Sequence, residues 1–150
     1  MIYRHALVCI DLRAVEAHQL LHRAASLTAR LSAVSVIETG SFESAAEPAA
    51  SLVEEEYNSR SAHLARLCAE ADCGEVEQRI LLGKAAAQIV AYAHENGCDL
   101  VVLGEHEDDG RPPGLGFTAD AVLRQLRCDG LVVKTRRPRS DALLPNEAAG

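Results

Sequence analysis

Residues Asp99–Gly116, DLVVLGEHEDDGRPPGLG, decide how this chain folds. The first part, Leu100–Gly104, is apolar on both faces of a pleated strand, which is typical of a strand covered on both sides. This run ends at a glycine. A polar segment rich in glycine and proline follows, and an amphipathic helix is expected to begin near Phe117. Because ligands bind at the carboxyl ends of strands in open parallel sheets, the segment is also the first candidate for a functional site.

Outward from this stretch, short apolar runs alternate with amphipathic stretches over a length that suits one domain. Strands are predicted at Tyr3–Ile10, Ala33–Ile37, Val76–Leu82, Leu100–Gly104 and Leu131–Val133. Helices are predicted at Ala14–Leu31, Ser51–Ala71 and Ala85–Asn96, and after Phe117 along the stripe that ends at Leu126. This alternation predicts an α/β fold with a parallel sheet and helices on both faces.

Two of the predicted helices are defined by their apolar stripes. The first carries Ala17, Leu20, Leu21, Ala24, Leu27 and Leu31 at helical spacing. The second carries Val53, Tyr57, Leu64, Leu67 and Ala71, and Arg60 interrupts its seam. Thr39–Ala49, between the second strand and this helix, is rich in serine, alanine and glutamate and is predicted to be a loop.

Composition narrows the class of protein. Five cysteines occur without a CxxC pair and are predicted to be reduced thiols rather than disulfide or zinc ligands. The net charge of −7 argues against nucleic acid as a partner. The sequence has neither an apolar stretch long enough to span a membrane nor a signal pattern, so a cytoplasmic protein without a membrane partner is expected.

Few residues suggest chemistry. Asp11 follows the first strand directly, where a carboxylate either caps the next helix or binds a ligand. His18 and His22 have a spacing that can hold a metal, but without an evident third ligand they are interpreted as surface residues. His106, between two glutamates, has no nucleophile or second histidine nearby. Since GxSxG, HExxH and Walker A patterns are absent from the sequence, no enzyme is predicted.

The chain resembles the universal stress protein family from Tyr3 to about Lys134. The resemblance rests on the strand that ends at Asp11, on GKAAAQIVAYAHENGCDLVVLG at Gly83–Gly104, and on the closing VLRQLRCDGLVVK. It implies an open five-stranded parallel sheet of order 3-2-1-4-5. It also implies a homodimer through the last strand, here Leu131, Val132 and Val133. The family domain would span residues 1–135, and residues 136–150 would form a flexible tail.

One branch of this family binds ATP through a glycine signature: G, two residues, G, nine residues, then G followed by Ser or Thr. Gly104 matches its first position, but Glu107 stands at the second. Gly116 comes one residue early, and Phe117 separates it from Thr118. The candidate nucleotide cleft implied by the resemblance consists of Asp11, Val36, Gly104, Gly114, Gly116, Phe117 and Thr118.

The loop's own chemistry opposes a triphosphate. A phosphate cradle needs backbone N–H groups that point at the anion. Here Pro112 and Pro113 lack that group, and Arg111 faces four carboxylates, those of Glu105, Glu107, Asp108 and Asp109. The expected function is therefore that of a homodimeric regulatory protein of the stress response that does not bind ATP, with its protein partner unknown. The alternatives are a regulatory module that binds ATP with magnesium, and a small-molecule carrier that uses the same cleft.

Overall fold

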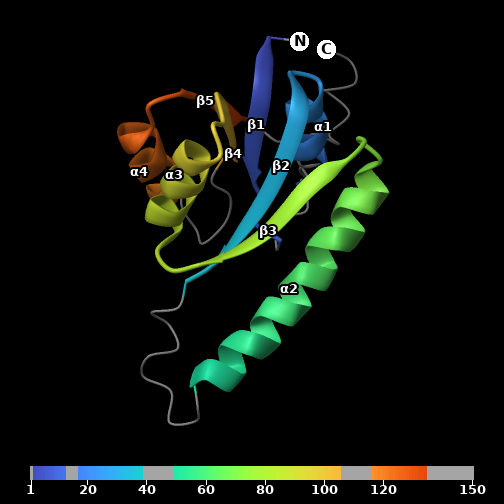
Figure 1. The fold of residues 1–150 in the computed structure, drawn as a ribbon, viewed down its shortest axis with the longest axis vertical. Helices are drawn as coiled ribbons and strands as arrows, with labels where there is room; N and C mark the ends of the chain where they lie inside the picture. The colour runs from blue at the N-terminus through green and yellow to red at the C-terminus, as the bar shows by residue number, and fades with distance from the viewer. Residues whose placement is uncertain (1, 13–16, 39–48, 106–115, 135–150) are drawn as a thin grey trace, which may run out of the picture.

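A single parallel sheet organises the computed structural model, which describes residues 2–12, 17–38, 49–105 and 116–134 (Figure 1). Its five strands lie in the order β3-β2-β1-β4-β5, which confirms the predicted fold class and topology. The strands are β1 (Tyr3–Cys9), β2 (Thr28–Ile37), β3 (Val76–Leu82), β4 (Leu100–Gly104) and β5 (Asp129–Val133). The helices are α1 (Ala17–Ala25), α2 (Ala49–Ala71), α3 (Ala85–Glu95) and α4 (Phe117–Gln125).

The helices cover both faces of the sheet, α1 and α2 on one side and α3 and α4 on the other (Figure 1). Strand β4 is apolar on both of its faces because helices cover the sheet on both sides. Leu100 and Val102 belong to the core under α1 and α2, whereas Val101 and Leu103 belong to the core under α3 and α4. All four side chains are buried, as expected for an internal strand of a doubly covered sheet.

The predicted boundary between the first helix and the second strand is wrong. Helix α1 ends at Ala25 rather than Leu31, and β2 begins at Thr28 rather than Ala33. The hydroxyl of Ser26 donates to the carbonyl of Arg23 (2.7 Å) at the end of the helix. Leu31 continues the helical spacing by coincidence, because it pairs with Ala6 of β1 and is buried as a strand residue. Ser26 therefore lies in a turn and Thr28 begins β2, where a further turn of helix was predicted.

The other boundaries differ by a few residues. Helix α2 begins at Ala49, which was predicted to be loop, and β5 begins at Asp129 rather than Leu131. Helix α4 ends at Gln125, with Leu126 as its C-terminal cap. Residues 39–48 and the predicted tail lie outside the described residues, so the domain boundary at residue 135 stays a prediction. No helix in the described part of the chain is long and apolar enough to cross a membrane.

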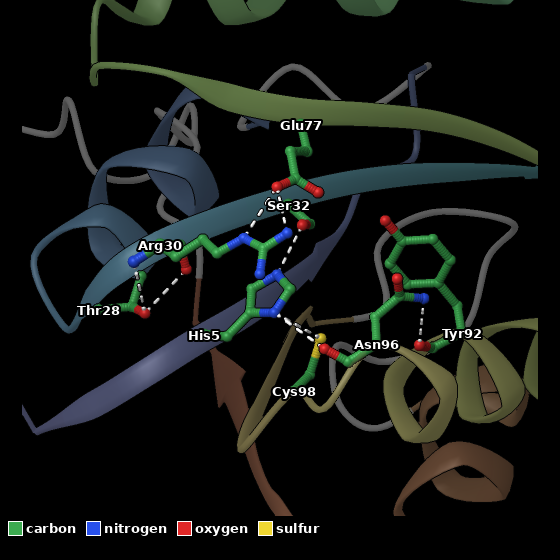
Figure 2. A network of polar contacts seen from close by, with 8 residues as sticks. All are labelled: His5, Thr28, Arg30, Ser32, Glu77, Tyr92, Asn96 and Cys98. Carbon is green, nitrogen blue, oxygen red and sulfur yellow. Dashed lines mark hydrogen bonds and ion pairs between the residues drawn. The ribbon is translucent and has the colours of Figure 1, made fainter.

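A buried polar network joins the amino ends of the strands (Figure 2). The side chain of His5 is bonded through Nε2 to the hydroxyl of Ser32 (2.7 Å) and through Nδ1 to the carbonyl of Asn96 (3.2 Å). A carbonyl can only accept, so Nδ1 donates to Asn96, and in the neutral form of the ring Nε2 then accepts from the Ser32 hydroxyl. Beside this network, Arg30 donates to Glu77 through Nε (2.8 Å) and Nη2. The buried network therefore fastens β1, β2 and the end of α3 to one another, and the exposed pair of Arg30 and Glu77 joins β2 to β3.

All five cysteines are free in the structure. Burial raises the pKa of Cys98, which lies within the network of Figure 2, to about 11. Burial likewise raises the pKa of Cys68, on α2, to about 11. Both thiols therefore stay protonated at neutral pH and act as small apolar side chains of the core.

Candidate functional site

A pocket of about 170 Å³ lies between the segment that follows β1 and helix α2. Its lining residues are Asp11, Leu12, Glu56, Ser59, Arg60 and His63. The backbone N–H of Ile10 still donates to Val34 of β2 (2.8 Å), so the chain leaves the sheet just before Asp11. The pocket therefore lies beyond the carboxyl end of β1, on the face of the sheet that α2 covers. Open α/β sheets bind ligands outside the carboxyl ends of their strands, so this pocket is a candidate binding site.

Arg60 connects the pocket to the sheet. Its Nη1 donates to the backbone carbonyl of Val36 on β2 (2.9 Å), and its Nε donates to the carboxylate of Glu56 one turn earlier (2.7 Å). The side chain of Arg60 is 31% exposed, so both bonds form at the mouth of the pocket rather than in the core. This arrangement explains why a charged residue interrupts the apolar seam of α2.

The pocket lining combines both signs of charge. Asp11 and Glu56 provide carboxylates, Arg60 a guanidinium, and Ser59 and His63 groups that can donate or accept hydrogen bonds. Such a lining suits a polar ligand that has donors at one end and acceptors at the other. The volume is smaller than the roughly 300–1,000 Å³ of pockets that enclose whole organic ligands. In the described conformation the pocket therefore admits only part of such a ligand.

The glycines of the predicted cleft lie at other elements. Gly104 ends β4, and a Cβ added there would come 3.2 Å from Cδ1 of Leu20, so this glycine allows α1 to pack closely. Gly116 is the N-terminal cap of α4 with a φ of −77°, a conformation open to any residue. Phe117 and Thr118 are exposed in the first turn of α4. Gly114, with the rest of the acidic loop at 106–115, lies outside the described residues.

The structure thus brings only part of the predicted cleft to the pocket. Asp11 lines it, and Val36 lies at its edge through the bond from Arg60. The sequence interpretation missed Glu56, Ser59, Arg60 and His63. A signal for them existed, because Glu56, Arg60 and His63 share one face of a helix at spacings of four and three, and Arg60 breaks the seam.

The metal hypothesis finds no support among the residues that the structure describes, where no group of three or more potential ligands comes together. His18 on α1 instead pairs with Glu70 on α2, with 3.4 Å between Nε2 and Oε1. His22 is exposed. His106 lies outside the described residues.

Comparison with known proteins extends these observations. The model of the "Universal stress protein family" matches residues 2–134. "Universal stress protein A homolog 1" of Coxiella burnetii is 30% identical over 141 residues, which cover 89% of this chain and 97% of the relative.

Solved structures with the same fold have lower identity. The universal stress protein UspA from Lactobacillus plantarum superposes with a TM-score of 0.71 at 20% identity, covering 91% of this chain and 99% of that protein. A universal stress protein from Archaeoglobus fulgidus, solved in complex with dAMP, superposes with a TM-score of 0.59 at 19% identity. That match covers 89% of this chain and all of the archaeal chain. From the family match over nearly the whole chain, this protein belongs to the universal stress protein family.

Proposed function

We propose that this protein is a homodimeric regulatory protein of the stress response that pairs through β5 and performs no catalytic step. The observation that carries the proposal is the position of β5 at the edge of the sheet, bonded to β4 alone among the described strands. Leu131 and Val132 are only half-buried in the single chain, although each packs against a core cluster. An apolar edge strand of this kind invites a further strand.

Pairing of two β5 strands about a two-fold axis would satisfy both edges at once. The same surface serves both subunits in such an interface, so one short strand is enough to define it. The pairing would join two five-stranded sheets and cover the half-buried side chains of β5. Regulation would then follow from contacts of the dimer with a protein partner.

Sedimentation and one proline substitution test the dimer. The wild type should sediment as a dimer at micromolar concentration, and Val132→Pro should give monomers because it disrupts the edge ladder. The matched control is Val76→Pro, at the first residue of the opposite edge strand, where proline is tolerated. Circular dichroism would check that both variants fold. A monomeric wild type would contradict the proposal.

A second candidate function, binding of an adenine mononucleotide, is favoured by the pocket beside β1. Asp11 lines this pocket, and a family member from Archaeoglobus fulgidus has been solved with dAMP. The exocyclic amine of adenine can donate a hydrogen bond to a carboxylate such as that of Asp11. A monophosphate also carries less negative charge than a triphosphate, so a chain with a net charge of −7 repels it less.

Thermal unfolding with added ligand tests this candidate. A ligand present at 100 times its dissociation constant stabilises the folded state by about 2.7 kcal/mol, which is a readily measured rise in Tm. Millimolar AMP should raise the Tm, ATP with magnesium should not, and Asp11→Asn should remove the effect of AMP. A rise with ATP that equals the rise with AMP would contradict the charge argument and favour the ATP-binding alternative.

A further inference from the structure

Helix α2 has two halves that are attached to the sheet in different ways. Leu64, Leu67, Cys68 and Ala71 in the carboxyl half are buried in the core. In residues 50–63 no side chain is buried, and the best covered ones are only half-buried. Figure 1 shows the amino half running past the carboxyl ends of the strands. Because burial of apolar surface supplies most of the stability of a docked helix, this half is held weakly.

The bond from Arg60 to Val36 lies where these two halves meet. It joins α2 to β2 with a charge-assisted hydrogen bond of 2.9 Å, and Glu56 orients the guanidinium from within the amino half (2.7 Å). The helix side of the pocket, opposite Asp11 and Leu12, is formed by Glu56, Ser59, Arg60 and His63. Whatever separates the amino half of α2 from the sheet therefore also opens the pocket.

We propose that residues 50–60 of this amino half are a lid over the pocket beside β1 and that Arg60 is the latch that holds them against the sheet. The pocket of about 170 Å³ holds only part of a nucleotide in this conformation, and movement of these residues away from the sheet would let it take in more of such a ligand. If a ligand binds only molecules in which these residues have moved away, its apparent affinity is its intrinsic affinity multiplied by the fraction of such molecules. The identity of the ligand rests on the second candidate function above, whereas the latch itself does not.

Hydrogen exchange of the full chain tests the latch without any ligand. Arg60→Ala should speed the exchange of the amides at 53–59 by about fivefold to tenfold, as expected for the loss of one such hydrogen bond. Amides at 64–71 should keep their rates because their half stays packed in the core. Glu56→Gln, which keeps the bond to Val36 but weakens the orientation of Arg60, should give a smaller increase. Arg66→Ala, at an exposed position further along the same helix, is the matched control.

Unchanged exchange at 53–59 in Arg60→Ala would overturn the latch. Acceleration spread equally over 64–71 would also overturn it, since the variant would then have loosened the whole helix.

Titration calorimetry with AMP tests the consequence for binding. Because Arg60 also lines the pocket and could contact the phosphate, the same titration is made with adenosine, which lacks that group: if opening limits access, Arg60→Ala should bind adenosine more tightly, by up to the factor by which exchange at 53–59 increases. Weaker or unchanged binding of adenosine in this variant would overturn the role of the latch in ligand entry. If neither the wild type nor Arg60→Ala binds AMP, the nucleotide proposal fails, and the exchange data alone decide whether the latch exists.

Discussion

Asp99 shows how one side chain can set the start of a strand. Its carboxylate accepts hydrogen bonds from the backbone N–H groups of Arg4 and His5, both at 3.0 Å, just before the internal strand β4. These two bonds hold the pKa of Asp99 below its ordinary value, because they favour the charged form. The side chain thus ties β1 to β4 before the ladder between them begins.

We predict that Asp99→Asn lowers the free energy of unfolding by about 1 kcal/mol at pH 7. The folded-state pKa is depressed, so this stabilisation is present above the unfolded pKa near 4 and is lost as pH falls through the folded pKa. The difference between wild type and variant in urea unfolding should therefore shrink between pH 5 and pH 2. The control is Arg4→Ala, because the Arg4 guanidinium lies 3.9 Å from Asp99 but is 95% exposed and should contribute little. A deficit that is the same at both ends of this pH range would contradict the prediction.

Single residues also show how far the site could be predicted. Asp11 could be found because it follows a recognisable strand directly. The role of Arg60 could not, because its partner carbonyl belongs to Val36, 24 residues earlier, and the contact exists only once α2 packs over β2. Periodicity marked Arg60 as an exception on its helix but could not say which element it meets.

At the scale of elements, the boundary between α1 and β2 shows a limit of periodic patterns. Ala24, Leu27 and Leu31 fit a helical stripe, yet Leu31, Ala33 and Ile37 fit a strand equally well. The tertiary structure decides between the two, because Thr28 to Val34 pair with β1 along its length and a longer helix would leave that edge unpaired. The apolar runs of β1 and β4 had no competing pattern, so β4 was predicted with its observed bounds and β1 to within one residue.

The contact between α4 and β5 depends on a glycine. A Cβ added to Gly130 would clash with the Cδ2 of Leu123 and approach Leu126 at 3.4 Å. We therefore predict that Gly130→Ala lowers the free energy of unfolding by about 1–3 kcal/mol through overpacking. Adding Leu123→Ala should recover part of this loss, since it removes the atoms that clash, and a double-mutant cycle in urea would measure the coupling. Additive effects of the two substitutions would show that α4 does not press on β5 at this point.

At the scale of the whole molecule, the topology was predictable because each strand-helix unit follows the same rule. Right-handed crossovers and alternating elements restrict the sheet to few orders, and the family resemblance selected one of them. The lid half of α2 was not predictable in the same way. Its exposure depends on how far the helix extends past the sheet, which is a property of the assembled layers and not of its own spacing.

The layered core also predicts which backbone amides exchange with solvent most slowly. Strand β1 pairs with β2 on one side and β4 on the other, and Val101 of β4 is completely buried between helices and sheet. Amides of β1 and of residues 100–104 should therefore exchange only through global unfolding and be the slowest in the chain. Edge strand β3, exposed over Glu77–Arg79, should exchange faster through local opening.

Val101→Ala turns this expectation into a quantitative test. Lost burial and the remaining cavity should lower the free energy of unfolding by about 1–3 kcal/mol. If β1 and β4 open only with the whole domain, exchange of all their amides should accelerate by one common factor, and that factor converted to a free energy should match the stability change measured in urea. Val76→Ala, on the edge strand and half-buried, is the matched control and should change both quantities less. Acceleration confined to β4 would show that this strand can separate from β1 while the rest of the sheet stays folded.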